Sequence, residues 1–352
     1  MKFIRFILVL SASTFILGSC STDVDLYADY KDIPIIYGVL NPIVDTNYIK
    51  ISHAFCGTND DPINANEIVQ IYDSSNYSVK LDARIIEMKS TNGSTYIPTG
   101  RILALDTITL HDKEEGIFYS PDQLFYYTTE PINMNKEREK YKYRLVVNMP
   151  SGDSLTAQTS VVGGEEFYIQ TSGVGFQPDE SNETGKIIFA ADGVASLYEV
   201  SMQFAYREQL AGQEMKKKYV GRSFGTKTIN DFTKVEGSTN LYYVEYSVNW
   251  LFNSLANAIG GDTIYDANHP NVVRYIDDFV ITIGAASQDM ALYYFANQAQ
   301  LNSPMSLVTT YTNIEGGYGL FASRTKIDKV MKLSSRTKRE LFGVDSWGFR
   351  EQ

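Results

Sequence analysis

The sequence predicts a mostly β protein, with an N-terminal β-sandwich followed by a larger β-rich domain that contains a few short helices. Many short segments alternate apolar and polar residues with a period of two, which is typical of half-buried strands. Turn residues separate these segments at intervals of about 10–20 residues, as in β-sandwiches. A chain of 352 residues with 25 Tyr and 18 Phe is also long enough to bury two cores.

The N-terminal sandwich is expected over residues 33–163. Asn41-Pro42 closes its first strand, and Asn92-Gly93 marks a tight hairpin turn. The expected strands lie at 33–40, 48–55, 78–88, 102–110 and 125–129, with a hairpin over 141–162 that turns at NMPSGD. In the third of these segments, alternation predicts four inward side chains, namely Val79, Leu81, Ala83 and Ile85.

The second domain is expected over residues 164–352, after a boundary at Gly163-Gly164. Its expected strands lie at 167–170, 186–190, 197–207, 242–248 and 279–283. Apolar residues at helical spacing predict helices over 250–259 and 288–300, and a third short helix is expected within 326–342. Paired tyrosines recur at 126–127, 242–243 and 293–294, and alternation places one of each pair against the core.

Charge and composition exclude several classes of protein. The chain has 31 basic and 42 acidic residues, a formal net charge of −11, so nucleic acid is not an expected partner. Two cysteines are too few for a disulfide scaffold or a cysteine-rich zinc module. Three histidines leave few ligands for a transition metal, and no cofactor is expected.

Residues 1–19 have the features of a lipoprotein signal peptide. Lys2 and Arg5 form a positive n-region, and an apolar stretch follows that is too short to span a bilayer. It ends in Leu17-Gly18-Ser19-Cys20, which resembles a bacterial lipobox, so we expect lipidation of Cys20. No later run of about 18 apolar residues exists, and the acyl chains are therefore the expected anchor in the lipid bilayer.

Residues 20–32 are expected to form an acidic tether after the lipidated cysteine. Asp23, Asp25 and Asp29 resemble the export signal of Bacteroidetes surface lipoproteins, although the acidic run is interrupted. A plain solvated linker is the alternative. The expected location is the outer membrane, and the sequence leaves open whether the protein faces the cell surface or the periplasm.

Three segments resemble a family of Bacteroidetes cell-envelope lipoproteins that contain a domain of unknown function. They are residues 33–40, the hairpin strands 141–145 and 156–162, and the run TNIEGGYGLF at 312–321. The resemblance implies an immunoglobulin-like N-terminal sandwich, a β-rich C-terminal domain and a place beside outer-membrane transporters, and it supplies no catalytic residue. In the last segment, Gly316, Gly317 and Gly319 favour positive φ and close packing, while Tyr318, Leu320 and Phe321 are expected to be buried.

A set of short motifs matches the serine esterases named for Gly-Asp-Ser-Leu. Ser154 within Gly152-Asp153-Ser154-Leu155 would be the nucleophile, with Asp266 and His269 completing a triad and Asn59 stabilising the oxyanion. However, the oxyanion block precedes the serine block, and strand patterns flank Ser154 on both sides instead of a strand-to-helix turn. Turn chemistry explains the same residues, so no catalytic residue is expected.

Three positions match a second short pattern, Asp followed by Ser or Thr and then an apolar residue. This resembles the O-glycosylation sequon of Bacteroidetes envelope proteins and makes Thr107, Ser154 and Thr263 candidate sites.

The loop from Asn59 to Glu67 gathers oxygen ligands of the kind that Ca²⁺ prefers, but its spacing is not that of an EF-hand. No metal site is therefore predicted, and a solvated loop is the alternative.

The sequence as a whole predicts a non-enzymatic outer-membrane lipoprotein. Its expected role is that of a binding or accessory protein for an envelope transporter, a glycan or a surface partner. The alternatives are the serine esterase using Ser154, Asp266 and His269, and a structural or adhesin subunit of the envelope.

Overall fold

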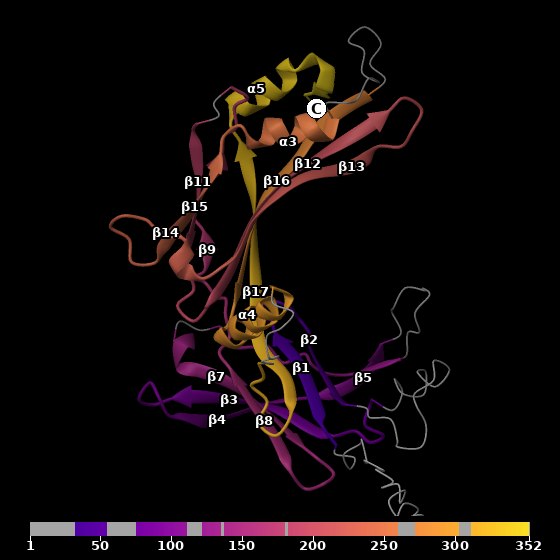
Figure 1. Ribbon diagram of the computed structural model, residues 1–352, viewed down its shortest axis with the longest axis vertical. Coiled ribbons are helices and arrows are strands. Elements are labelled where there is room, and N and C mark those ends of the chain that lie inside the picture. The colour runs from indigo at the N-terminus through magenta and orange to yellow at the C-terminus, as the bar shows by residue number, and fades with distance from the viewer. Residues whose placement is uncertain are drawn as a thin grey trace, which may run out of the picture.

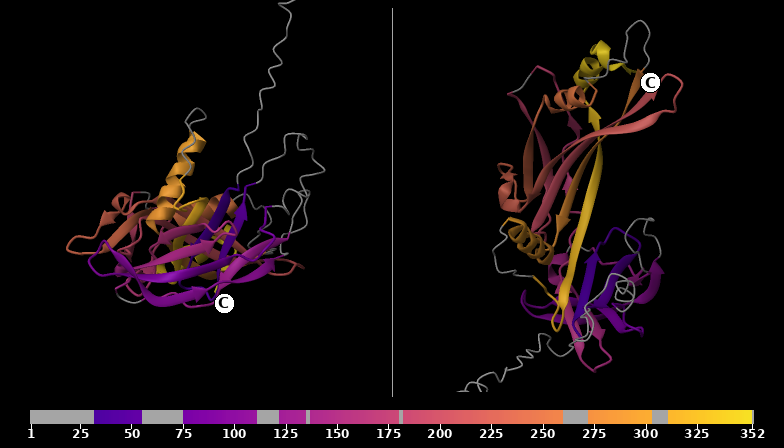
Figure 2. Two further views of the ribbon diagram at one scale, coloured as in Figure 1. Left: turned by 90° about the horizontal axis from the view of Figure 1, so that it is seen from below. Right: turned by 45° about the vertical axis from the view of Figure 1, so that its right-hand side comes forward.

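The computed structural model describes residues 32–54, 75–110, 122–134, 137–179, 182–259, 272–302 and 311–351. It confirms a mostly β fold with several sheets and a few short helices (Figure 1). The molecule is elongated, with an N-terminal sandwich at one end and a larger β-rich unit at the other (Figures 1 and 2).

The N-terminal unit is an immunoglobulin-like sandwich. One layer has the order β1(Pro34–Leu40), β2(Asn47–His53), β6(Gln123–Thr128), β5(Asp106–Leu110), and the other has the order β4(Tyr96–Ala104), β3(Asp82–Ser90), β7(Tyr141–Asn148), β8(Ser154–Thr159). Lettered along the chain, these orders are A-B-E-D and C′-C-F-G, which are those of immunoglobulin domains. The expected hairpin over 141–162 is present as β7 and β8.

Alternating side chains of both layers fill the core of this sandwich. Ile36, Ile49 and Tyr126 from one sheet meet Ile85 and Leu145 from the other. Leu81, Ala83 and Ile85 are buried as the alternation predicted. The prediction for Val79 was wrong, because its side chain is exposed and β3 begins only at Asp82, so strand alternation does not yet apply there.

The second unit packs a small sheet against long, twisted strands. The long strands are β12(Leu197–Leu210), β13(Lys216–Lys227), β16(Val272–Ala286) and β17(Tyr318–Leu333). The small sheet has the order β14(Thr233–Lys234), β15(Leu241–Ser247), β11(Thr184–Ala190), β9(Tyr168–Ile169), while β10(Gly173–Val174) pairs with β17 and β18(Phe349–Arg350) with β16. The core between them is rich in aromatic rings, including Phe176, Phe189, Phe204 and Phe279.

Three α-helices are present in the described part of the chain, with short 3₁₀ turns at η2(Arg138–Lys140), η3(Ile229–Asp231) and η4(Asp345–Trp347). The predicted helices over 250–259 and 288–300 are confirmed as α3(Trp250–Ile259) and α4(Gln288–Asn302). The third prediction was partly wrong, because residues 326–333 belong to β17 and α5 covers only Ser335–Gly343. Burial alternates with a period of two along that part of β17, and Ser334 caps the helix by accepting a hydrogen bond from the Thr337 backbone N–H at 3.1 Å. No helix within the described ranges is long and apolar enough to cross a membrane.

Strand β17 joins the two units into one continuous sheet. Its first part pairs in parallel with β1, from Tyr318 beside Ile35, and its second part pairs antiparallel with β16, from Arg324 beside Ala286. The resulting ten-stranded sheet runs through both units (Figure 1). Ile314 and Phe321 therefore lie in the first core, although they follow the expected boundary at Gly163-Gly164 by more than a hundred residues of sequence.

A buried polar network also fixes the junction. The Ser287 hydroxyl accepts hydrogen bonds from the Thr159 hydroxyl at 3.2 Å and from the Ser323 backbone N–H at 3.1 Å. The Ser323 hydroxyl in turn accepts from the Val162 backbone N–H at 3.1 Å. Thr159, Ser287 and Ser323 are buried. Separating the units would therefore remove the hydrogen-bond partners that these polar groups need.

Candidate functional site

An exposed aromatic surface covers the outer side of the sheet β1-β2-β6-β5. We call it the aromatic face and define it by the exposed Tyr37, Val39, Tyr48, Ile108 and Tyr318, with the half-buried Phe125, Tyr127 and Tyr293 between them. Elements that adjoin it carry further exposed side chains, namely Ile43 and Val44 in the β1–β2 turn and Leu292 and Phe295 on α4. Together these account for nine of the seventeen large hydrophobic residues that are exposed in the described part of the chain.

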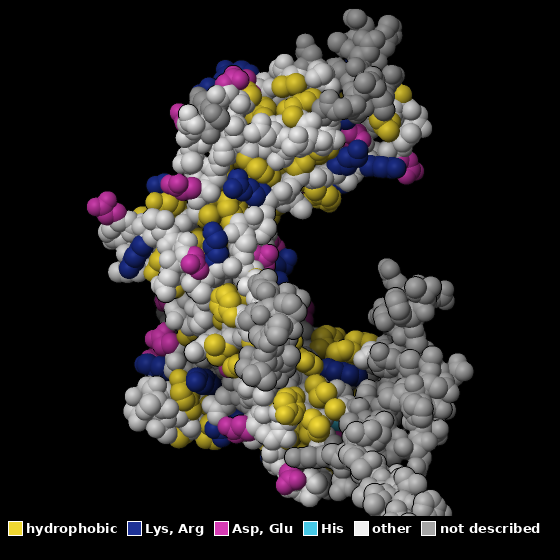
Figure 3. Space-filling model, in the orientation of Figure 1, with side chains coloured by type: hydrophobic (Ala, Val, Ile, Leu, Met, Phe, Trp, Pro, Cys, Tyr) yellow, Lys and Arg dark blue, Asp and Glu magenta, His cyan; other side chains and the backbone are white. Residues whose placement is uncertain are grey.

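Strand register makes this surface continuous. Tyr37 lies opposite Lys50, and Tyr48 lies opposite Tyr127, on strands that are hydrogen-bonded neighbours. The ring centroids of Tyr48 and Phe125 are 6.2 Å apart, and those of Tyr37 and Tyr293 are 6.4 Å apart. Figure 3 shows hydrophobic side chains gathered over β1 and the neighbouring end of β17.

Few charges interrupt the aromatic face. Lys50 lies within it, where its ammonium group is 5.4 Å from the centroid of the Phe125 ring and donates to the Asn76 side chain at 2.8 Å. Burial lowers the pKa of Lys50 from its ordinary value. Burial and the adjacent Tyr293 hydroxyl raise the pKa of Tyr37, so Tyr37 is neutral at physiological pH and presents an uncharged ring.

Helix α4 stands out from the same side of the molecule as the aromatic face (Figure 2). Tyr293 on this helix contacts Tyr37 on β1, while Leu292 and Phe295 are exposed. A helix that projects with exposed hydrophobic side chains extends the surface available to a large partner.

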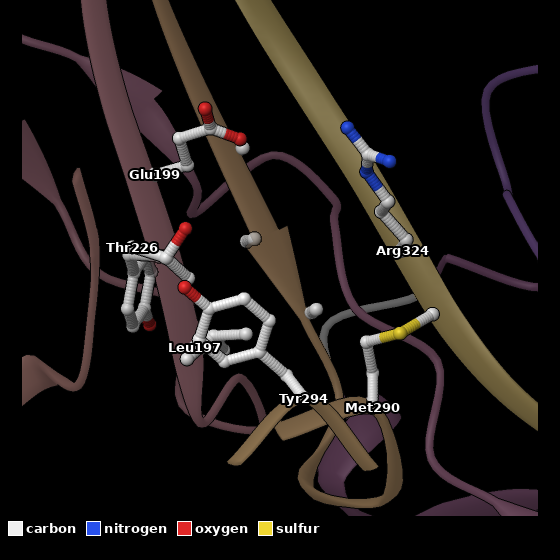
Figure 4. A pocket seen from close by; sticks show the side chains of 10 residues that line it. Leu197, Glu199, Thr226, Met290, Tyr294 and Arg324 are labelled. Carbon is white, nitrogen blue, oxygen red and sulfur yellow. The ribbon is translucent and has the colours of Figure 1, made fainter. Parts of the chain in front are cut away.

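A concave feature, the α4 pocket, lies where α4 meets the strands of the second unit. It has a volume of about 230 Å³ and is lined by Leu197, Tyr198, Glu199, Thr226, Gly284, Ala285, Ala286, Met290, Tyr294 and Arg324. Figure 4 shows Glu199 and Arg324 on opposite sides of β16, with Tyr294 and Met290 at the end formed by α4. The lining is mostly apolar, and Leu197 and Ala286 pack with Ala291 in a small cluster beneath α4.

Ser154 is the first residue of β8, immediately after a tight turn, and its side chain is exposed. Its hydroxyl donates to the side-chain oxygen of Asn148 at 2.8 Å, directly across the hairpin. The turn places Gly152 at φ 92°, as turn chemistry predicts. Asn59, Asp266 and His269 lie outside the described residues, so Ser154 is seen only as a hairpin residue between two strands.

Of the remaining candidate residues, only Thr107 lies within the described part of the chain. Thr107 is half-buried on the edge strand β5, and its backbone N–H donates to the Asp106 carboxylate at 2.8 Å. Cys20, Thr263 and the loop from Asn59 to Glu67 lie outside the described residues. Within the described ranges, no group of three or more His, Cys, Asp or Glu side chains is placed to hold a metal ion.

Two charged segments of the second unit form ion pairs. Lys217 lies 2.7 Å from Asp277, and Lys218 lies 2.5 Å from Glu208. Glu208 also pairs with the buried guanidinium of Arg274 at 2.7 Å. These groups lie near the turn that joins β12 to β13, and their charges are already compensated.

The outer residues of the first two strands are the part of the candidate site that sequence reasoning missed. Strict alternation would place polar residues opposite the core, yet Tyr37, Val39 and Tyr48 occupy outward positions. Apolar residues on both faces of a strand indicate either a covering layer or an interaction surface. Of the tyrosine pairs, Tyr126 is buried and Tyr127 joins the aromatic face, as alternation predicted for one of each pair, while both tyrosines of the other two pairs are half-buried.

No protein-family model matches the sequence, and no curated protein matches it. Among solved structures, the chain is similar to one described as "Crystal structure of tetra-tandem repeat in extending region of large adhesion protein". The identity is 7%, the match covers 86% of this chain and 74% of that chain, and the TM-score is 0.19. A likeness at this level supports no inference about function.

Proposed function

We propose that this protein is a non-enzymatic, lipid-anchored protein of the outer membrane that binds a partner in the cell envelope through the aromatic face. The supporting observation is that nine of the seventeen large hydrophobic side chains that are exposed among the described residues gather on and beside one sheet. Single exposed hydrophobic residues are ordinary, but a contiguous patch of them is typical of an interaction site.

The chemistry of the aromatic face favours a protein partner. Interface centres are enriched in tyrosine and depleted in charge, because rigid amphipathic rings bury a large area at little entropic cost. The aromatic face presents Tyr37, Tyr48 and Tyr127 around the cation Lys50. Glycan stacking on the same tyrosines is the second candidate, since Tyr37 and Tyr48 are each more than two-fifths exposed.

The proposed lipid anchor favours a partner that is embedded in the membrane. Residues 20–32 lead from Cys20 directly into β1, which is a strand of the aromatic face. At about 3.3–3.6 Å per residue, this tether can hold β1 no more than about 50 Å from the acyl chains. An integral envelope transporter is therefore the partner class that this proposal names.

The direct test compares two matched double variants in the native host. Tyr37→Ser with Tyr48→Ser changes the aromatic face, where the tyrosines are 47% and 42% exposed, and Tyr168→Ser with Tyr219→Ser changes tyrosines elsewhere that are 46% and 54% exposed. We expect an integral membrane protein to co-purify in mild detergent with the wild type and the control pair, and to be lost from the first pair. Equal retention of the membrane protein by both pairs of variants would overturn the proposal. If the wild type binds purified glycans and only the first pair loses this binding, the partner is a glycan and not a protein.

Protease treatment of intact cells tests the location separately. A surface-exposed chain is digested by added proteinase K, whereas a periplasmic chain is digested only after lysis. Substitution of Cys20 by Ala should release the protein from the membrane fraction, because the proposed acyl anchor is then absent. Retention of the Cys20→Ala variant in the membrane would contradict the lipid anchor.

A further inference from the structure

The α4 pocket has an apolar floor between two opposite charges. Glu199 on β12 lies beside Gly284 on β16, and Arg324 on β17 lies beside Ala286 on the same central strand. Neighbouring strands are about 4.8 Å apart and each residue rises about 3.4 Å along a strand, so the backbones of Glu199 and Arg324 are separated by about 12 Å across β16. Figure 4 shows the two side chains flanking that strand.

Both charged groups are available to a ligand. In the part of the chain that the structure describes, neither the Glu199 side chain nor the Arg324 side chain takes part in a hydrogen bond or an ion pair, and both side chains are exposed. At the apolar end, the Tyr294 hydroxyl accepts a hydrogen bond from Gln298 at 2.7 Å and keeps its own proton to donate. Leu197 and Met290 complete that end.

We propose that the α4 pocket binds a small zwitterion with an apolar body, of the chemical class of a dipeptide. Its amino group pairs with Glu199, its carboxylate pairs with Arg324, and its apolar side chain packs on Leu197, Met290 and Tyr294. A volume of about 230 Å³ lies below the range of about 300–1,000 Å³ for drug-sized ligands, which limits the body to this size. A free α-amino acid holds both charges on one carbon and cannot reach both walls.

The inference is independent of the proposed function, because no residue that lines the α4 pocket belongs to the aromatic face. Glycine at position 284 gives the means to test it. A side chain added to Gly284 would meet its nearest atoms, Glu199 Cβ and the Thr325 carbonyl oxygen, at 3.8 Å, which is ordinary contact. Gly284→Val therefore fills the floor of the pocket and leaves the strand unstrained.

The matched control is Gly221→Val on β13. Gly221 is also a strand glycine without a positive φ, and an added Cβ would meet the Met202 carbonyl oxygen at 3.5 Å. Gly221 does not line the pocket. Melting temperatures of both variants establish that they fold before binding is measured.

The probes are alanyl-phenylalanine, its N-acetyl derivative and its C-terminal amide, titrated into the purified protein and followed by NMR. We expect saturable binding of the dipeptide, and binding about three- to tenfold weaker for each derivative, because each loses one charge-assisted contact at an exposed site. We expect Gly284→Val to abolish binding and Gly221→Val to retain it. In Glu199→Gln, the acetylated and free dipeptides should bind equally, since the group that distinguishes them is gone.

Three results would overturn this assignment. The first is equal affinity for the three probes, which would mean that the two charges do not recognise the termini. The second is undiminished binding to Gly284→Val, which would place the site elsewhere. The third is the absence of saturable binding by any probe.

Discussion

The side-chain amide of Asn313 forms a pair of hydrogen bonds with the backbone of Phe321. Asn313 accepts from the Phe321 N–H at 2.9 Å and donates to the Phe321 carbonyl at 2.7 Å, as a neighbouring strand would. The same amide donates to the Gln158 carbonyl on β8 at 3.3 Å. The first and last residues of the run from Asn313 to Phe321 thus fasten the start of β17 to the N-terminal sandwich.

Removing this amide should destabilise the N-terminal sandwich. Asn313→Ala leaves the backbone groups of the fully buried Phe321 without these partners, and we expect a loss of about 2–3 kcal/mol in the free energy of unfolding. Urea denaturation measures the change. The control Asn297→Ala removes one hydrogen bond within helix α4 and should change stability by less than about 0.5 kcal/mol. Equal losses in the two variants would contradict a special role for Asn313.

Gly319 should be intolerant of any side chain. Its φ is 114°, and an added Cβ would overlap the carbonyl oxygen of Ile36 on β1. We expect Gly319→Ala to lose more than about 4 kcal/mol, or to fail to fold, because both the dihedral angle and the parallel pairing of β1 with β17 oppose it. Gly212→Ala is the control, since φ is 76° with nothing within 4 Å, and should cost about 1–2 kcal/mol. If Gly319→Ala lost no more free energy of unfolding than Gly212→Ala, close pairing of β17 with β1 at Gly319 would be contradicted.

Much of this arrangement is predictable from sequence, because strands and turns leave local patterns. The alternation of the hairpin over 141–162 and the turn at Gly152 are properties of adjacent residues. The glycine-rich run was interpreted as structural, and the positive φ of Gly316 and Gly319 and the burial of Leu320 and Phe321 confirm this. The expected burial of Tyr318 was wrong, because pairing with β1 turns this side chain to the outer face.

The remaining features depend on contacts between residues that are far apart in the sequence. Parallel pairing of β17 with β1 joins residues nearly 300 positions apart, and no local pattern marks the partner of such a strand. The same holds for the aromatic face, which becomes visible only when register aligns Tyr48 with Tyr127. Glu199 and Arg324 likewise come together only through the central strand β16.

The buried ion pair of Glu208 and Arg274 should make stability sensitive to acid. Burial acts to raise the pKa of Glu208, but hydrogen bonds from Lys218 and Arg274 outweigh it and lower the pKa below its ordinary value of 4.5. A carboxylate with a lowered pKa stabilises the fold fully above about pH 4.5, and this contribution is lost as the pH falls through the folded-state value.

The matching variant is Glu208→Gln. It leaves the guanidinium of Arg274, which is 1% exposed, without its carboxylate and should cost about 3–5 kcal/mol at neutral pH. The difference from the wild type should stay constant from about pH 5 to 8 and shrink below about pH 4.5. Thermal or urea unfolding across this range measures it, and a difference that stays unchanged down to pH 3 would refute the linkage.

O-glycosylation at the three sequons predicts excess mass in the native host. Ser154 is exposed at the start of β8, and Thr107 is half-buried on β5, so each lies on the outermost strand of its sheet in the described part of the chain. We expect the mass of the native protein, measured by intact-mass spectrometry, to exceed the mass of the lipidated chain. Substitution of Thr107, Ser154 and Thr263 by Ala should remove the excess stepwise, and a native mass equal to that of the lipidated chain would reject the sequons.

The central claim is that the aromatic face contacts an envelope partner, and site-specific photocrosslinking in living cells of the native host tests it most directly. A photoreactive phenylalanine analogue replaces Tyr48 on the aromatic face or, as the control, Tyr219 on β13, which is also well exposed. We predict that irradiation links the probe at position 48 to one integral outer-membrane protein and that the probe at position 219 gives no such product. The absence of a crosslink at position 48, or the same product from both positions, would contradict this account.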